Sequence, residues 1–211
     1  PFNPYGHTKA MAEQVLRDWC AAEAAADRPA AAVALRYFNV AGADVQGRTG
    51  NSAAGATHLL KVACEAALGK RRSMSVYGTD YETPDGTGVR DFIHINDLVD
   101  AHLQALTYLR RGGGPLIANC GYGKGYSVLD IVEAVRRATN VDFKVDYAPR
   151  RPGDAPLVVA DSSLAKQVLG WVPRYDDLAV IVETALSWER RLAQVAEPDI
   201  KDLRRRLASG F

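Results

Sequence analysis

The chain has 211 residues, of which 47% are hydrophobic and 24% charged, a composition ordinary for a globular protein. Its formal net charge of +1 provides no basic field for nucleic acid or an anionic membrane surface, and no apolar run reaches the roughly eighteen residues that span a bilayer. Three widely spaced cysteines, Cys20, Cys64 and Cys120, lack metal-ligand spacing and favour a reducing, cytoplasmic compartment. The first residue is Pro rather than Met and no signal peptide is recognisable, so we expect a processed or partial product.

The chain begins with a Tyr and a Lys four residues apart. Pro4 and Gly6 indicate a turn around Tyr5, and a helix is predicted over residues 9–26. Four residues are about one helical turn, so Tyr5 and Lys9 would share one face. A Lys ammonium near a phenol favours the phenolate, which makes Tyr5 a candidate proton-transfer group. The alternative interpretation is that Tyr5 and Lys9 are ordinary solvent-exposed residues at the start of a helix.

A buried parallel strand is predicted over residues 32–38, a nearly continuous apolar run. Asn39 follows its carboxyl end, where ligands bind in open α/β sheets. From the residues alone, Asn39 is either a turn former or a ligand-binding amide. After a polar loop over 44–55, a second helix is predicted over 57–68, with Thr57 as its N-cap.

The strand predicted over residues 89–95 carries charges within an apolar context. It follows a turn-rich loop, 78–88, whose length favours a functional role. A buried Arg needs a partner, so Arg90 is expected either to pair with Asp91 or Asp97 or to bind a phosphate through its planar guanidinium.

Two histidines favour structural roles: His58 at a helix start and His94 on a strand. The next helix is predicted to be capped by Asn96 or Asp97 and to end near Arg110. No histidine cluster and no Ser-His-Asp trio suggests a metal site or hydrolysis.

A strand over 115–120 leads into Gly121-x-Gly123-x-Gly125, which lacks Gly-x-Gly-x-x-Gly spacing and is interpreted as a tight turn rather than a cofactor loop. Ser127 and Asp130 resemble a capping box that opens a helix over 128–139. The other predicted elements are a strand over 74–77, a strand over 143–147, a charged turn over 150–154, a short helix from Asp161 to Gly170 and a last helix over 177–195. Strands alternating with helices predict the α/β class.

Seven segments, taken together, resemble the nucleotide-sugar epimerases of the extended short-chain dehydrogenase family. They cover nearly all of the chain up to Trp171 in the family's order, and the segment from Asp85 to His94 is specific to the 4-epimerase branch. The segments are Asn3-Pro-Tyr-Gly-x-x-Lys9, Leu35-Arg-Tyr-Phe-Asn39, Tyr77-Gly-Thr-Asp-Tyr81, Thr83-Pro-Asp-Gly-Thr-Gly-Val-Arg-Asp-Phe-Ile-His94, Gly125-Tyr-Ser-Val128, Arg150-Arg-Pro-Gly-Asp154 and Leu169-Gly-Trp171.

The resemblance implies roles for the matching residues. Tyr5 matches the catalytic Tyr, and Lys9 matches the Lys that binds the nicotinamide ribose of NAD; Tyr37 and Phe38 are implied near the nicotinamide. The implied substrate contacts are Asn39 at the sugar or diphosphate, Thr57, His58 and Leu59 where the family usually has Asn-Asn-Leu, Ser75, Val76 and Tyr77 at the uracil, Arg90 and Arg151 at the diphosphate, and Asp154 at a ribose hydroxyl.

The implied activity is NAD-dependent epimerisation at C4 of a UDP-hexose, UDP-glucose or UDP-galactose, through a 4-keto sugar. The family is commonly dimeric through a bundle that includes the Tyr-Lys helix. One alternative is a UDP-sugar-binding remnant without catalysis, because the family's Gly-rich loop, acidic ribose ligand and catalytic Ser or Thr precede the Tyr motif and have no counterpart here. Another is a UDP-pentose 4-epimerase, because Thr57, His58 and Val159 depart from the usual pattern.

The expected fold is therefore a partial Rossmann-like, doubly wound sheet with a smaller C-terminal α/β substrate-binding region. Residues 1–56 are assigned to the NAD-binding part and residues 57–200 mainly to the UDP-sugar-binding part. Within the latter, one strand and helix at about 90–111 are expected to return to the Rossmann sheet, and residues 201–211 form a charged tail.

Overall fold

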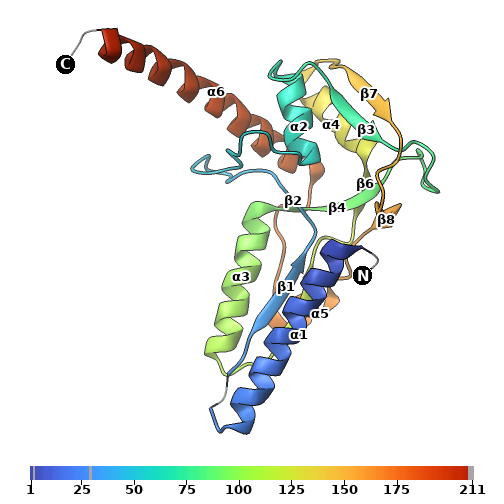
Figure 1. Cartoon of the computed structure of the whole chain (residues 1–211), viewed down its shortest axis with the longest axis vertical. Coiled ribbons are helices and arrows are strands. Elements are labelled where there is room, and N and C mark those ends of the chain that lie inside the picture. The colour runs from blue at the N-terminus through green and yellow to red at the C-terminus, as the bar shows by residue number, and fades with distance from the viewer. Residues whose placement is uncertain (2, 29, 209–211) are drawn as a thin grey trace.

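The computed structural model confirms the α/β class (Figure 1). It describes residues 1, 3–28 and 30–208, with residues 195–208 as backbone only; the end of the expected tail, 209–211, lies outside the described residues. The helices are α1 (Pro4–Ala25), α2 (Leu59–Ala67), α3 (Ile95–Arg110), α4 (Val128–Thr139), α5 (Ser163–Leu169) and α6 (Leu178–Ala208). The strands are β1 (Val33–Tyr37), β2 (Asn39–Ala41), β3 (Met74–Tyr77), β4 (Val89–His94), β5 (Leu116–Cys120), β6 (Gly125–Ser127), β7 (Val145–Ala148) and β8 (Leu157–Val158).

The strands form three small sheets. β1 pairs in parallel with β5, and β3 pairs in parallel with β7. β4 lies in the middle of the third sheet, where it pairs with β2 and β8 in parallel and with β6 in antiparallel. Because β2 begins only two residues after β1 ends, the chain passes from the first sheet to the third at Asn39.

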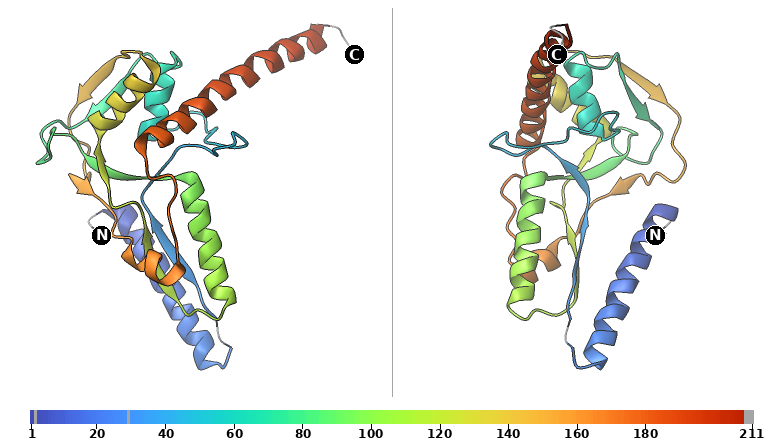
Figure 2. Two further views of the ribbon diagram at one scale, coloured as in Figure 1. Left: turned by 180° about the vertical axis from the view of Figure 1, so that it is seen from behind. Right: turned by 60° about the vertical axis from the view of Figure 1, so that its left-hand side comes forward.

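The segment 90–111 is expected to return to the part formed by residues 1–56; its strand β4 pairs with β2, and its helix α3 contacts β1 and β2. α3 lies against one side of β1 and α1 lies on the other side (Figure 2). The strand that pairs with β1 comes instead from residues 116–120.

Two buried aspartates, Asp91 and Asp97, accept hydrogen bonds from segments that are distant in the sequence. Asp97 accepts hydrogen bonds from the Tyr122 hydroxyl at 2.7 Å and from the backbone N–H groups of Arg174 and Tyr175. Asp91 accepts from three backbone N–H groups, including that of Tyr122 at 3.0 Å. Since buried carboxylates are tolerated only when they are hydrogen-bonded, these contacts fix the loops after β5 and β8 against β4, and the segment after α5 against α3.

Several helix boundaries differ from the sequence prediction. α1 begins at Pro4, since the nitrogen of a Pro in the first helical turn needs no hydrogen-bond partner. The Asn3 side chain is the N-cap and accepts the N–H of Gly6 at 2.8 Å. The prediction that Thr57 caps α2 is wrong, since His58 occupies that position without a side-chain bond.

The cap of α3 is also displaced by two or three residues from its prediction. His94 Nδ1 accepts the N–H of Asn96 at 3.1 Å, so His94 rather than Asn96 or Asp97 is the N-cap. Its side chain is fully buried and also contacts Thr184 Oγ1 at 3.1 Å, which confirms the structural role predicted for His94. The Ser127–Asp130 capping box is confirmed at α4.

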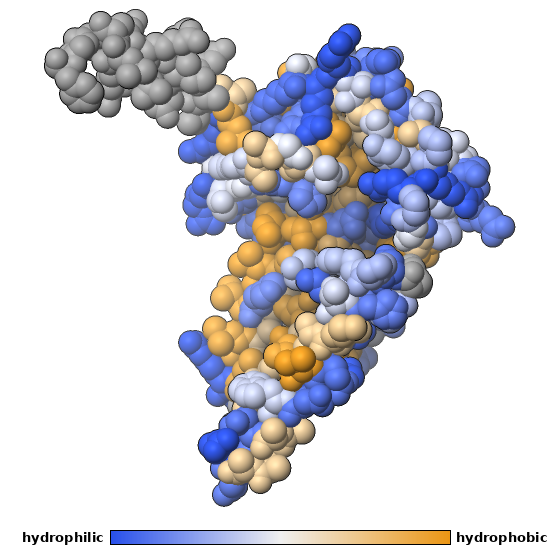
Figure 3. Space-filling view, in the orientation of Figure 1, coloured by the Kyte–Doolittle hydropathy of each residue, from blue (hydrophilic) through white to orange (hydrophobic). Residues whose placement is uncertain are grey.

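The outer faces of α1 and α3 expose apolar side chains, visible as orange and tan patches in Figure 3. Cys20 is the one buried side chain of α1 among its described residues. Nothing in the described helices is long and apolar enough to cross a membrane. The exposed apolar residues are Met11, Val15, Leu16 and Trp19 on α1 and Val99, Leu103 and Leu106 on α3.

Candidate functional site

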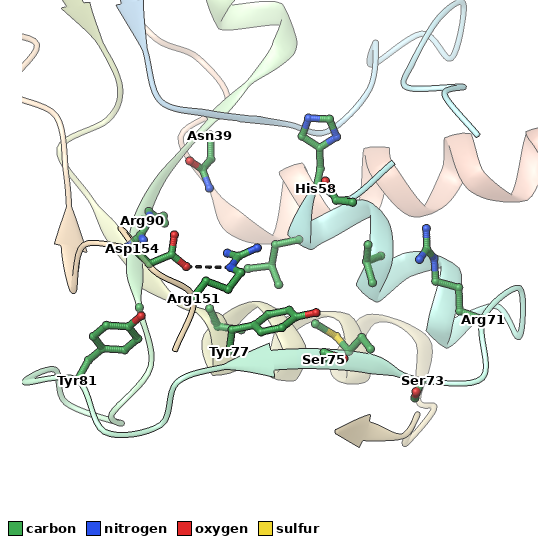
Figure 4. A pocket seen from close by; sticks show the side chains of 16 residues that line it. Asn39, His58, Arg71, Ser73, Ser75, Tyr77, Tyr81, Arg90, Arg151 and Asp154 are labelled. Carbon is green, nitrogen blue, oxygen red and sulfur yellow. Dashed lines mark hydrogen bonds and ion pairs between the residues drawn. The ribbon is translucent and has the colours of Figure 1, made fainter. Parts of the chain in front are cut away.

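A cleft of about 390 Å³ lies where β2, α2, β3, β4 and α4 meet (Figure 4). It brings together most of the residues that the sequence analysis assigned to the substrate, from segments more than 100 residues apart. Its lining residues are Asn39, Thr57, His58, Leu59, Val62, Arg71, Ser73, Met74, Ser75, Tyr77, Tyr81, Gly88, Arg90, Val128, Arg151 and Asp154.

One end of the cleft is formed by β3. Side chains alternate along a strand, so Ser75 and Tyr77 face the cleft while Val76 is fully buried on the opposite face. The structure therefore does not bring the Val76 side chain to the site. The Tyr77 ring is 40% exposed and offers a flat aromatic surface of the kind on which a base can stack. The Arg151 guanidinium lies 4.8 Å from its centroid.

The cleft is cationic beside the Tyr77 ring. Arg151 Nε pairs with Asp154 Oδ2 at 2.9 Å, and Arg90 donates from Nη1 to the Val89 carbonyl at 2.8 Å. Burial lowers the pKa of Arg90; charge interactions with Asp154 and Tyr81 oppose that shift, and Arg151 adds to it. Two guanidiniums against one carboxylate leave a net positive charge here, which suits an anion.

The alternative of an Arg90 ion pair with Asp91 or Asp97 is wrong. Both carboxylates are directed into the interior, where backbone N–H groups and the Tyr122 hydroxyl occupy their oxygens. The Arg90 side chain is consequently half-buried without a carboxylate partner among the described residues, and it faces the cleft.

Asn39, His58 and Leu59 border both this cleft and a second cavity of about 310 Å³. Tyr37 and Phe38, implied near the nicotinamide, line that second cavity. His58 Nδ1 lies 3.4 Å from the Asn51 amide nitrogen, so the loop before α2 touches the residue that departs from the family's Asn-Asn-Leu pattern.

Tyr5 and Lys9 do not line either cavity. Tyr5 is 71% exposed, and Lys9 Nζ lies 5.2 Å from the centroid of its ring, which confirms the shared helix face. The start of α1 does lie near the cleft's charged turn: a Cβ added at Gly153 would come 3.7 Å from Cβ of Asn3. The two parts of the candidate site are thus adjacent but not assembled into one cavity.

Sequence reasoning missed several lining residues, among them Tyr81, Gly88 and Val128. Tyr81 and Val128 belong to segments that carried the family resemblance, but no role came with them. Their distance along the chain from the other lining residues gives no local signal that they border a cleft. Arg71 was also missed; it pairs with Glu65 and donates to the Ala56 carbonyl at the cleft's edge.

The family model described as "NAD dependent epimerase/dehydratase family" matches residues 1–121. Among curated proteins, a UDP-glucose 4-epimerase of Azospirillum brasilense is 53% identical over 194 residues, which are 92% of this chain and 54% of that protein. The chain spans about half the length of the curated relatives it matches.

Solved structures show the same relation. The UDP-glucose 4-epimerase from Brucella ovis, solved in complex with NAD, is 44% identical with a TM-score of 0.82, over 89% of this chain and 56% of that one. The UDP-glucose 4-epimerase from Stenotrophomonas maltophila, solved with NAD and formylated UDP-arabinopyranose, is 36% identical with a TM-score of 0.84, over 92% of this chain and 56% of that one. The likeness identifies the fold as Rossmann-like.

Proposed function

The chain belongs to the NAD dependent epimerase/dehydratase family, and from this premise we propose that it carries the UDP-sugar site and the Tyr-Lys pair of an NAD-dependent UDP-hexose 4-epimerase acting on UDP-glucose and UDP-galactose. The observation that supports it most is the cleft that brings together an aromatic ring, Tyr77, and two guanidiniums, of which that of Arg151 lies 4.8 Å from the ring centroid. A nucleoside diphosphate has the matching base and anion.

The substrate is proposed to lie along the cleft from β3 toward β2. The uracil stacks on Tyr77 beside Ser75, and Arg90 and Arg151 bind the diphosphate. Asp154 accepts from a ribose hydroxyl once Arg151 turns to the phosphates. The sugar then lies at the border of the two cavities, near Asn39, Thr57, His58 and Leu59.

The residues present suit the nicotinamide end of NAD. Lys9 and Tyr5 can donate to ribose hydroxyls, and Tyr37 and Phe38 offer aromatic surface. The sequence holds no Gly-x-Gly-x-x-Gly loop, so groups outside this sequence are proposed to hold the pyrophosphate. Bound beside these residues, NAD would supply the hydride acceptor and donor for C4 of the sugar.

The chain's own chemical step is a proton transfer. Tyr5, as a phenolate beside the Lys9 ammonium, takes the proton from the 4-hydroxyl as the 4-keto sugar forms, and gives it back after the sugar has turned. The two arginines keep the diphosphate in place during that rotation. Residues 1–56 are proposed to belong to the NAD-binding part and 57–200 mainly to the substrate part. Homodimerisation is proposed through the exposed apolar face of α1, since such faces mark interaction sites.

Two other functions remain as candidates. A UDP-sugar-binding protein without catalysis is favoured by the exposure of Tyr5 outside both cavities. A UDP-pentose 4-epimerase is favoured by Thr57 and His58 at the sugar end and by the UDP-arabinopyranose bound to the Stenotrophomonas maltophila structure. Rates with UDP-galactose and UDP-arabinose, measured on a protein as long as its relatives, separate hexose from pentose.

The test of the nucleotide site is UDP binding by this chain, measured by calorimetry and by the shift of its melting temperature. We expect binding that the Arg90→Ala variant weakens about 10- to 100-fold, because a charge-assisted bond to phosphate is lost. The absence of any UDP binding would contradict the proposal. NAD released on denaturing the purified chain supports the epimerase over the non-catalytic alternative, and UDP binding without NAD favours the latter.

A further inference from the structure

Tyr81 has a buried hydroxyl that nothing in the described chain satisfies. Its side chain is 6% exposed and lines the cleft, yet the hydroxyl oxygen has no hydrogen-bond partner. Leaving a buried polar group unpaired costs free energy of folding, so such a group in a folded protein needs an explanation.

The ring is held too firmly for the hydroxyl to turn elsewhere. Gly78, at φ +79°, packs so closely that an added Cβ would lie 2.5 Å from a ring carbon of Tyr81. The Arg150 guanidinium lies 4.2 Å from the ring centroid on a side chain that also pairs with Asp80. The Tyr81 N–H donates to the Gly86 carbonyl at 2.9 Å, which closes the loop around it.

The hydroxyl is directed toward β4, the strand that carries Arg90 (Figure 4). Arg90 donates to the Val89 carbonyl and keeps further N–H donors that face the cleft. Tyr81 is also among the groups whose charge interaction affects the pKa of Arg90, which places the two side chains in the same electrostatic neighbourhood. The Arg90 guanidinium, which has free N–H donors and no carboxylate partner among the described residues, therefore lies near the Tyr81 hydroxyl, which has no hydrogen-bond partner there.

We propose that Tyr81 is a positioning residue for diphosphate binding: its hydroxyl oxygen accepts an N–H of the Arg90 guanidinium when Arg90 binds the diphosphate. The inference rests on the proposed nucleotide site and adds a residue to it. An Arg that binds phosphate with two of its nitrogens has a fixed plane, and a rigid acceptor behind it holds that plane without itself touching the ligand.

The experiment compares Tyr81→Phe with the unaltered 211-residue chain in calorimetric titrations with UDP and with uridine. We expect UDP affinity to fall about 5- to 10-fold, the effect of losing one hydrogen bond that positions Arg90 without touching the ligand, while uridine affinity is unchanged. The melting temperature of the ligand-free variant should be equal or higher, because an unpaired buried hydroxyl is removed. Tyr147→Phe, which removes a hydroxyl 64% exposed on β7, is the matched control and should change neither affinity.

A double-mutant cycle with Arg90→Lys tests whether Tyr81 acts through Arg90. Because a Lys cannot form the fork that Tyr81 would hold, Tyr81→Phe should cost no further UDP affinity in that background. Equal losses of UDP and uridine, additive losses in the cycle, or unchanged UDP affinity each overturn the inference while leaving the nucleotide site in place. A lowered melting temperature of the free variant also overturns it. An unaltered chain that binds no UDP removes the proposed function itself.

Discussion

The nucleotide cleft and the start of α1 carry the two halves of the proposed site, and they differ in how the chain supports them. Tyr81 in the cleft is 6% exposed and packed between Gly78 of its own loop and the distant Arg150, whereas Tyr5 on α1 is 71% exposed. The cleft is assembled from long-range contacts around the buried Asp91 and Asp97. Helical spacing places Tyr5 and Lys9 next to each other on α1. Their position relative to a substrate depends on how α1 packs against the rest of the protein.

The attachment of α1 explains this difference. Its long-range polar contact is an ion pair in which Arg36 donates twice to Glu13 at 2.6 Å, and its one buried side chain is Cys20. Exposed ion pairs are worth little, about 0–1 kcal/mol, so α1 is expected to open locally at lower free energy than the cleft.

The sharpest separation of the two regions comes from Tyr5→Phe in a version of the protein as long as its curated relatives. Turnover should fall about 10²- to 10⁴-fold because the proton acceptor is lost, and UDP affinity should stay the same because the cleft does not contain Tyr5. Steady-state kinetics and calorimetry measure the two quantities, with Tyr147→Phe as the control. If UDP binding falls as much as turnover, Tyr5 is structural and the comparison fails.

The next effect is on stability. Asp97→Ala removes a buried carboxylate that accepts from the Tyr122 hydroxyl and two backbone N–H groups, and leaves those donors buried and unpaired. The free energy of unfolding should fall by about 3 kcal/mol in urea titrations. Asp18→Ala on α1, which loses an exposed contact with Gln14, should change it by less than about 0.5 kcal/mol. If both variants lose a similar free energy of unfolding, α1 is as stably packed as the region around Asp97.

The smallest predicted difference is in cysteine labelling. Burial raises the pKa of Cys64 to about 12 and that of Cys120 to about 11, so both thiols stay protonated and inert near pH 8. Cys20, buried under a weakly attached α1, should react with iodoacetamide at least about tenfold faster through local opening. Peptide mass spectrometry over a time course measures the three rates; equal protection of Cys20 would place α1 in the stable core.

The sequence was informative wherever function follows from local order. Helical spacing placed Tyr5 and Lys9 on one face, and the Ser127–Asp130 pattern identified a capping box that the structure confirms. The prediction from the sequence failed where the residue type fits more than one structural role. Thr57 suits an N-cap by type, but the chain is still extended at His58, which directly precedes the first helical turn and is the N-cap.

Tertiary contacts decided what the local pattern left open. Arg90 could have paired with Asp91, its neighbour along the chain, but successive side chains of a strand point to opposite faces, and Asp91 is turned inward to backbone N–H groups. The same alternation removed the Val76 side chain from the cleft. Tyr81 lines the cleft because of the conformation of the loop between β3 and β4, which the local sequence pattern does not indicate.

By itself the sequence determined the α/β class and the shared helix face of Tyr5 and Lys9, because these depend on order and spacing along the chain, and its motifs carried the resemblance that identified the family. The tertiary structure alone decided which side chains border the cleft, why Arg90 is left without a carboxylate, and that Tyr5 lies outside both cavities. Those outcomes depend on which buried polar groups find partners across distant segments, because a buried carboxylate such as Asp97 is stable only where donors from other segments satisfy it.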